Sequence, residues 1–274
     1  MASNEGQRAF WNREDFAAAW PKRERLTTEV TPHLVAALAL KRGERVVEVG
    51  SGGGLAAIAA ARAVGPGGEV LGLDLSAPLT RMAAARAAEA GVTNVRFSVG
   101  DAQEDAIPGA PYDAAMSQFG VMFFADPVAA FRNVRVHLKP GGRLAFACWQ
   151  PGSANAWFPG GVLSRFVDAP AALPPPSATP PPGPFAFGDP EYVRGILGGA
   201  GFRDIGHTPL EIEVGVPDET LYDDATIRTT AGVPPEREAE AWEALRGWAT
   251  NMRGADGDLH LVLAVHIFAA HNPG

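Results

Sequence analysis

The chain has 274 residues, of which 46% are hydrophobic and 20% charged, with 32 glycines and 24 prolines. This composition is too apolar for a disordered chain and too interrupted for a coiled coil, and the length suffices for one large core. The net charge of −8 disfavours a nucleic-acid partner, and the single cysteine, Cys148, excludes an internal disulfide and a cysteine-rich metal site.

Residues 1–40 precede the first strand-like run and are expected to form an N-terminal helical cap. Phe10, Trp11, Phe16 and Trp20 recur there at a spacing that fits a helix. The polar N-terminus resembles no secretory leader, and no apolar run reaches the ~18 residues that a membrane span needs. We therefore expect a cytoplasmic protein without a membrane span.

From residue 41 to 149, apolar strand-like runs alternate with alanine-rich helical segments, which is typical of a parallel sheet covered on both faces. Strands are predicted at 45–49, 69–73, 95–99, 114–117 and 143–147, and helices at 55–64, 77–90 and 127–137. Glycine or proline follows each helix. The pattern predicts a Rossmann-like α/β fold with a seven-stranded sheet, mostly parallel, whose last strand is antiparallel.

Residues 150–188 are expected to form a proline-rich lid inserted into the single domain, because eight prolines fall within residues 170–184. Residues 189–274 should complete the sheet. We predict a helix at 190–200, a strand region at 202–216, helices around 219–231 and 235–252, and a last strand at 261–270.

The most informative segment is a glycine-rich turn between the first strand and the first core helix. It reads Glu-x-Gly-x-Gly-x-Gly from Glu48 through Gly54, an arrangement that lets backbone N–H groups approach a ligand. A dinucleotide site would require a third small residue where Leu55 stands. The Tyr-x-x-x-Lys pair of short-chain reductases is also absent, which disfavours an NAD(P)-dependent reductase.

This motif, with four later segments in the same order, resembles the class I S-adenosylmethionine (SAM)-dependent methyltransferases. The later segments are residues 70–76, 100–102, 112–124 and 138–144. The likeness is closest to the small-molecule branch that includes ubiquinone and menaquinone biosynthesis methyltransferases. Glu48 stands where aspartate is commoner, and Ser51 and Gly53 stand where the branch often has cysteines.

The resemblance implies a cofactor, SAM, whose product is S-adenosylhomocysteine, and a set of residues that bind it. The glycine-rich loop would hold the methionine part, Asp74 the ribose hydroxyls, Leu75 the adenine face and Asp101 with Ala102 the adenine edge. The implied cofactor-binding residues are Glu48, Gly50, Ser51, Gly52, Gly54, Asp74, Leu75, Asp101, Ala102, Ser117 and Gln118. From the residues alone, Asp74 is equally consistent with an N-cap for the next helix, and Asp101 with a cap for a turn.

The acceptor is expected to be a small, aromatic or apolar metabolite methylated on O, N or C, because aromatic side chains recur in the segments that should converge above the sheet. The candidate pocket residues are Trp11, Trp20, Phe123, Trp157 and Phe158. No metal site is expected, and no histidine stands out as a base, since His266 on an apolar strand is more often structural. An alternative is a SAM-binding protein that no longer methylates and serves as a rearrangement catalyst or partner subunit.

Overall fold

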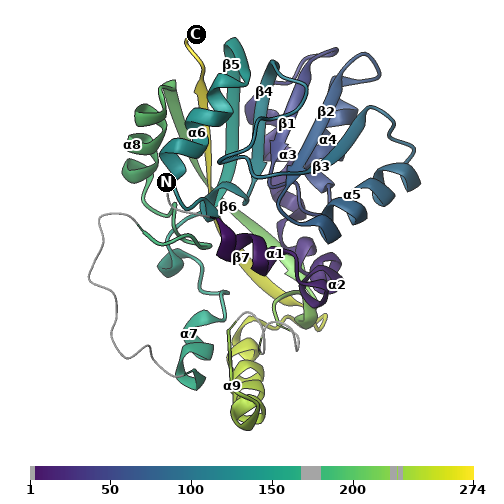
Figure 1. Ribbon diagram of the computed structural model, residues 1–274. Coiled ribbons are helices and arrows are strands. Elements are labelled where there is room, and N and C mark those ends of the chain that lie inside the picture. The colour runs from purple at the N-terminus through teal and green to yellow at the C-terminus, as the bar shows by residue number, and fades with distance from the viewer. Residues whose placement is uncertain (1–3, 168–179, 223–226, 228–230) are drawn as a thin grey trace.

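A computed structural model describes residues 4–167, 180–222, 227 and 231–274. Its centre is a seven-stranded sheet in the order β3-β2-β1-β4-β5-β7-β6 (Figure 1). The strands are β1 (Arg45–Val49), β2 (Glu69–Asp74), β3 (Val95–Val99), β4 (Tyr112–Gln118), β5 (Leu138–Trp149), β6 (Arg203–Val216) and β7 (Leu259–His271). Among them, β7 runs antiparallel to both of its neighbours. The expected Rossmann-like fold with one antiparallel strand is therefore confirmed.

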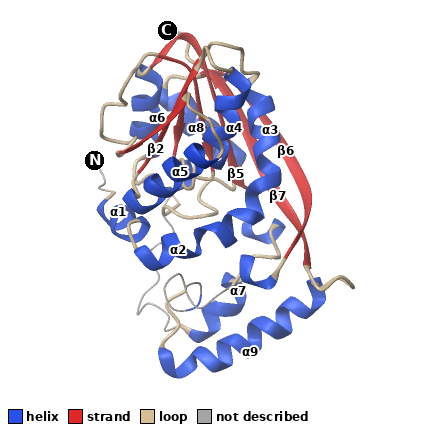
Figure 2. Ribbon diagram, turned by 90° about the vertical axis from the view of Figure 1, so that its right-hand side faces the viewer, coloured by secondary structure: helices blue, strands red, loops and turns tan. Residues whose placement is uncertain are grey.

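Helices cover both faces of the sheet. They are α1 (Glu5–Trp11), α2 (Glu14–Arg23), α3 (Thr31–Leu38), α4 (Leu55–Val64), α5 (Ala77–Glu89), α6 (Pro127–Val136), α7 (Gly160–Leu163), α8 (Pro190–Ala200) and α9 (Glu238–Ala249). α3 and α4 pack together on one face, and α6 and α8 on the other (Figure 2). None of the helices in these described ranges is long and apolar enough to cross a membrane.

Two of the core helices, α5 and α6, begin at side-chain caps. Ser76 caps α5 by accepting a hydrogen bond from the Leu79 N–H at 3.2 Å, and Asp126 caps α6 through the Ala129 N–H at 3.0 Å. The cap of α5 is thus Ser76 and not Asp74, so the carboxylate of Asp74 is available for another role.

The segment expected as one N-terminal cap divides into two parts. α1, α2 and a 3₁₀ helix, η1 (Glu24–Val30), lie across the carboxyl ends of the parallel strands, whereas α3 joins the layer on the sheet face (Figures 1 and 2). α3 joins the sheet because it buries apolar side chains there, since Leu34 and Leu38 are 0% and 1% exposed.

The expected lid and the C-terminal helices are described only in part. Residues 168–179, which include most of the proline-rich run, lie outside the described residues, as do 223–226 and 228–230. Near the end of the run, the N–H of Gly183 donates to the carbonyl of Met122 at 3.1 Å. Near residue 219 the described chain forms a 3₁₀ turn at Asp218–Thr220 where we predicted a helix, and α9 packs against α7 (Figure 1).

Candidate cofactor and acceptor site

A cavity opens at the carboxyl ends of β1, β2, β3 and β4, beneath the N-terminal helices. The space free of protein atoms inside it and at its open mouth, solvent included, amounts to about 1050 Å³. Pockets of several hundred Å³ with a few polar groups among apolar walls are typical of small-molecule sites. Ligands of open α/β sheets bind at this edge, where the strand order reverses between β1 and β4.

The glycine-rich loop forms the floor of the cavity through a close approach of two backbones. Gly50 has φ of +70°, and a Cβ placed on it would lie 2.8 Å from the Cα of Gly120, which follows β4. The N–H of Gly50 donates to the carbonyl of Leu73 at 2.8 Å, which fixes the loop to the end of β2. A side chain at Gly50 would therefore separate β1 from β4 at the cavity floor.

Asp74 lies at the end of β2 and is tied to this loop. Its two carboxylate oxygens accept hydrogen bonds from the N–H groups of Gly52 at 2.7 Å and Ser76 at 2.8 Å. Burial raises the pKa of Asp74, while these two backbone N–H groups act to lower it. The carboxylate lines the cavity in a fixed orientation.

Among the buried polar atoms of the cavity lining that have no hydrogen-bond partner within the described structure, three belong to uncharged or acidic side chains. They are Oε2 of Glu48, Oγ of Ser51 and Nε1 of Trp20. Buried polar groups in proteins are nearly always hydrogen-bonded, so a cluster of unsatisfied atoms around one cavity indicates a polar ligand. Burial chiefly, with the charges of Asp74 and Glu24, raises the pKa of Glu48 well above its ordinary value.

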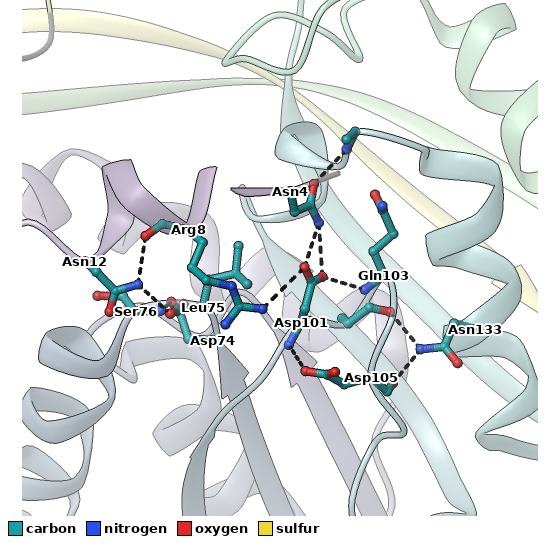
Figure 3. Close-up of polar contacts among 12 residues, drawn as sticks. Asn4, Arg8, Asn12, Asp74, Leu75, Ser76, Asp101, Gln103, Asp105 and Asn133 are labelled. Carbon is teal, nitrogen blue, oxygen red and sulfur yellow. Dashed lines mark hydrogen bonds and ion pairs between the residues drawn. The ribbon is translucent and has the colours of Figure 1, made fainter. Parts of the chain in front are cut away.

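Asp101, after β3, is held mainly by the N-terminal segment (Figure 3). Nδ2 of Asn4 donates to both carboxylate oxygens of Asp101 at 3.0 Å, and the guanidinium of Arg8 lies 3.8 Å away. The N–H of Gln103 also donates to Asp101, at 2.9 Å, so the turn-capping interpretation of this residue holds as well.

A second asparagine fastens the other end of α1. Asn12 donates from Nδ2 to the carbonyl of Leu75 at 2.9 Å (Figure 3). Its Oδ1 accepts from the N–H of Ala77 at 3.0 Å. Trp11 packs edge to face on Phe123 with ring centroids 5.0 Å apart. These contacts make α1 a roof over the β2 and β3 side of the cavity.

The β1 and β4 side is bounded by the end of α2 and by η1. The Arg86 guanidinium bridges the Glu24 carboxylate and the carbonyl of Gly53, joining η1 to the loop. Gln118, at the end of β4, donates to the carbonyl of Thr27 at 3.2 Å and accepts from the Thr31 hydroxyl at 2.9 Å.

Most of the sequence-predicted site residues are brought together in this cavity. Its lining includes Glu48, Gly50, Ser51, Gly52, Asp74, Leu75, Asp101, Ala102, Gln118, Trp11, Trp20 and Phe123. Gly54 and Ser117 do not line the cavity but lie next to residues that do. Gly54 precedes α4 with φ of +86°, and Ser117 is 0% exposed and accepts from the Gly120 N–H at 3.2 Å.

Trp157 and Phe158 do not line the cavity, contrary to our prediction. Trp157 donates to Oδ1 of Asn155 at 2.8 Å and packs against Trp149, whose other face stacks on Phe119 at 4.1 Å between centroids. Phe119 is the ring of this series that reaches the cavity. Sequence proximity to β5 indicated the right region, but Trp149 intervenes.

Other cavity residues were missed by sequence reasoning. Asn4, Arg23, Glu24 and Thr27 come from the N-terminal segment, and no local pattern pairs that segment with a loop tens of residues away. Phe119 and Gly120 lie in segment 112–124, which resembles the methyltransferase pattern, and their position after the fourth strand could have indicated a place at the cavity.

The one histidine considered as a pocket residue, His266, lies outside the cavity. It is 5% exposed on β7. Its Nδ1 lies 2.8 Å from Nε2 of His207 on β6. The described residues contain no group of three or more metal-ligating side chains.

The fold and this cavity define a class of protein, and comparison with known sequences agrees. A family model described as a methyltransferase domain matches residues 46–142. Residues 46–142 therefore form a methyltransferase domain.

Particular relatives follow. The chain is 34% identical over 185 residues to a nocamycin O-methyltransferase from Saccharothrix syringae, a match that covers 64% of this chain and 65% of that protein. The chain thus spans slightly less than two thirds of that relative's length.

Two solved structures share the fold. Phosphoethanolamine N-methyltransferase 2 from Haemonchus contortus, in complex with SAM, has a TM-score of 0.59 at 18% identity and covers 97% of this chain and 60% of its own. The cyclase SpnF has a TM-score of 0.52 at 22% identity, covering 90% of this chain and 81% of its own.

Proposed function

We propose that this protein transfers a methyl group from SAM to a small, aromatic or apolar metabolite by in-line displacement. The observation that carries the proposal is the group of three unpartnered buried polar atoms around a cavity at the strand ends of a methyltransferase domain. The relative that is named an O-methyltransferase favours oxygen over nitrogen or carbon as the methylated atom.

The lining residues fit the parts of this cofactor in order along the sheet edge. Asp74 offers a carboxylate to the two ribose hydroxyls, and Leu75 with Leu79 offers apolar contact to the adenine. Asp101 and Ala102, one strand further, also line the cavity and would face the adenine edge. The loop at Gly50–Gly52 would hold the methionine part, where its backbone leaves no room for side chains.

The chemistry asks little of the protein beyond placement. A sulfonium methyl is already activated, so the protein must hold the acceptor about 3 to 3.5 Å from it and exclude water. Trp11, Phe119 and Phe123 line the cavity and would supply flat apolar contact to an aromatic acceptor.

Calorimetry with S-adenosylhomocysteine tests the cofactor assignment directly. We expect micromolar binding of S-adenosylhomocysteine and none of NADPH. Binding of NADPH without S-adenosylhomocysteine would refute the proposal and favour the reductase.

A second candidate function is a SAM-binding protein that does not methylate, and the composition of the cavity favours it. No histidine, lysine, tyrosine or cysteine of the described chain lines the cavity, so the groups there that could act as a base are carboxylates, and three of these, Glu24, Asp74 and Asp101, already have partners. Incubation with SAM and a panel of phenolic and polyketide acceptors separates the two functions. Formation of S-adenosylhomocysteine with a methylated acceptor supports transfer, whereas acceptor rearrangement with SAM intact supports the alternative.

The proposal also covers the partner class, the cellular location and the division of the chain. The net charge of −8 supports a small-molecule partner over nucleic acid, and we propose a cytoplasmic location. Residues 150–188 would form a lid, 41–149 the SAM-binding core, and 1–40 and 189–274 the flanking parts of a single domain. Removing residues 174–182 should leave affinity for S-adenosylhomocysteine unchanged, and loss of folding would contradict the lid.

A further inference from the structure

Phe119, directly after β4, has a backbone conformation that bulky residues rarely adopt. Its φ is +60°, and within the described residues the other non-glycine positions with positive φ are Ala39 and Asp204. Ala39 ends α3 and Asp204 lies at an irregularity of β6, where such a conformation is common. Phe119 instead lines the cavity. Strained backbone of this kind clusters at binding and catalytic sites.

The turn at Phe119 is required by the cavity floor, but its side chain is not. The turn brings Gly120 so close to the first loop that a Cβ on it would lie 2.9 Å from the Cα of Gly50. The N–H of Phe119 donates to the carbonyl of Ala147 on β5 at 3.0 Å, which fixes where the chain leaves the sheet. Glycine would adopt the same backbone without strain. The phenylalanine ring therefore requires an explanation of its own.

The ring of Phe119 is supported from one side. It stacks on the Trp149 ring with centroids 4.1 Å apart and planes 19° apart. Trp149 is buried in the core and packs in turn against Trp157, with centroids 4.9 Å apart. Phe119 itself is only partly buried and lines the cavity. The backbone turn and the stack therefore hold a flat ring at the cavity wall before any ligand binds.

Two other rings of the cavity are arranged differently. Trp11 and Phe123 meet edge to face, with an interplanar angle of 83°. This pair joins α1 to the segment after β4, so its geometry depends on the position of α1. Phe119 stacks on a residue of β5 and keeps that support when α1 opens.

Phe119 also lies at the end of the cavity where methyl transfer would take place. Asp74 and Asp101 follow β2 and β3, whereas Phe119 follows β4, and β1 lies between β4 and β2 in the sheet. With the ribose and adenine of the cofactor toward β2 and β3, the β4 end is left for the sulfonium methyl and the acceptor. Gln118 and Gly120 line the cavity beside Phe119. An acceptor held about 3 to 3.5 Å from the methyl would therefore lie beside this ring.

We propose that Phe119 selects a planar aromatic acceptor by stacking on it, so that the acceptor ring extends the stack that begins at Trp149. This inference rests on the proposed function and names its substrate class. Aromatic rings attract each other in offset stacks beyond the apolar area that they bury, and a saturated ring of the same size lacks this attraction. A ring that is fixed before binding loses little conformational entropy on contact. The planarity of the acceptor, and not its size alone, should therefore decide binding.

The experiment measures the binding of two probes to the full chain saturated with S-adenosylhomocysteine. 2-Naphthol is planar, and decahydro-2-naphthol is its saturated counterpart of similar size. Calorimetry compares the unchanged chain with Phe119→Leu, Phe119→Tyr and a Phe158→Leu control. Phe158 packs edge to face on Trp157 and Phe185, in the same series of rings, but does not line the cavity.

We expect the unchanged chain to bind 2-naphthol more tightly than its saturated counterpart. Phe119→Leu should weaken 2-naphthol roughly 3- to 10-fold, the loss of one aromatic pair, and leave decahydro-2-naphthol within about twofold. Phe119→Tyr has a flat ring and should keep the preference, and Phe158→Leu should not alter it. All three variants should bind S-adenosylhomocysteine as the unchanged chain does, which shows that they are folded.

Other outcomes overturn the inference in distinguishable ways. If Phe119→Leu weakens both probes equally, or weakens S-adenosylhomocysteine, the ring has a structural role. If it changes the binding of neither probe, the ring does not contact the acceptor. An equal loss in Phe158→Leu would assign the effect to packing along the series of rings. Failure of 2-naphthol to bind the unchanged chain, or to bind it more tightly than the saturated probe, would show that the cavity does not select planar acceptors. If S-adenosylhomocysteine itself fails to bind the unchanged chain, the proposed function fails.

Discussion

At the scale of single residues, the cavity lining contains both polar atoms that are hydrogen-bonded within the protein and buried polar atoms that are not. Asp74 is oriented by two backbone N–H groups, whereas Glu48 is 1% exposed with one oxygen unpartnered. Orientation before binding reduces the entropy that a ligand must lose, and an unsatisfied buried group lowers the stability of the ligand-free protein. Substitution of Asp74 is therefore expected to weaken ligand binding, whereas substitution of Glu48 is expected to stabilise the ligand-free protein.

Replacement of Asp74 by alanine should weaken S-adenosylhomocysteine by about 1.5–3 kcal/mol, because hydrogen bonds to a charged group are lost. Calorimetry at neutral pH measures the change. Asp74→Asn is the matched control, since it keeps an acceptor oxygen for the Gly52 N–H but removes the charge, and it should lose part of that affinity. Equal affinity in all three proteins would show that Asp74 does not contact the ligand.

Replacement of Glu48 by glutamine should stabilise the ligand-free protein at pH 8 but not at pH 5. Burial raises the pKa of Glu48 in the folded chain, so its contribution to stability is complete below the pKa of the unfolded chain and is lost as the pH rises through the folded pKa. Glutamine mimics the protonated form at every pH. Thermal melts without ligand at the two pH values measure the difference in Tm, and an equal shift at both would mean that ionisation of Glu48 is not the cause.

At the scale of elements, α1 is held by polar contacts and not by a buried face. None of its seven residues is buried, yet Asn4 and Asn12 at its ends bind the segments after β3 and β2 (Figure 3). An element with little buried apolar surface opens at a lower free-energy cost than the core. α1 is thus suited to open for entry of a ligand and to close over it.

Replacement of Asn4 by alanine should release α1 and speed the dissociation of S-adenosylhomocysteine. The lost hydrogen bonds to a carboxylate correspond to roughly 1.5–3 kcal/mol of docking energy, or about a tenfold or greater increase in dissociation rate. Stopped-flow displacement measures the rate, and hydrogen exchange of the α1 amides measures opening.

The Asn4→Asp variant sharpens this test. It places a second carboxyl group against Asp101, so repulsion between the two should make exchange in α1 faster at neutral pH than in the unchanged chain. Protection of α1 that is unchanged in both variants would contradict the role of Asn4.

At the scale of the whole molecule, the sequence predicted what local pattern encodes and missed what long-range contact decides. β1, β3, α4 and α8 have the predicted bounds because apolar runs and glycine stops define them. The cavity floor was predictable from the motif for the same reason. Asn4 and Arg23 were not, because their positions depend on how the N-terminal helices cross the sheet, and Trp157 was misplaced because a neighbouring ring packs between it and the cavity.

A long-range contact of this kind also predicts how acid acts on the molecule. Nε2 of His207 on β6 and Nδ1 of His266 on β7 lie 2.8 Å apart, and Nε2 of His266 lies 3.2 Å from the carbonyl of Gly188. A hydrogen bond between two rings requires one unprotonated nitrogen. Burial lowers the pKa of both histidines, and their mutual proximity lowers that of His207 further.

Because the folded pKa values are depressed, this pair should destabilise the protein as the pH falls. Its contribution to stability is present above the ordinary histidine pKa of about 6.5 and is lost as the pH falls toward the folded values, since the unfolded chain binds the protons first. The Tm should fall between pH 7.5 and 5.5, and fall less in His207→Gln, which keeps a donor for His266 but cannot gain a charge. His260→Gln is the control, because this exposed histidine pairs with Asp256 at the surface. A full acid-dependent fall in His207→Gln would show that the join between β6 and β7 is not the acid-sensitive part of the fold.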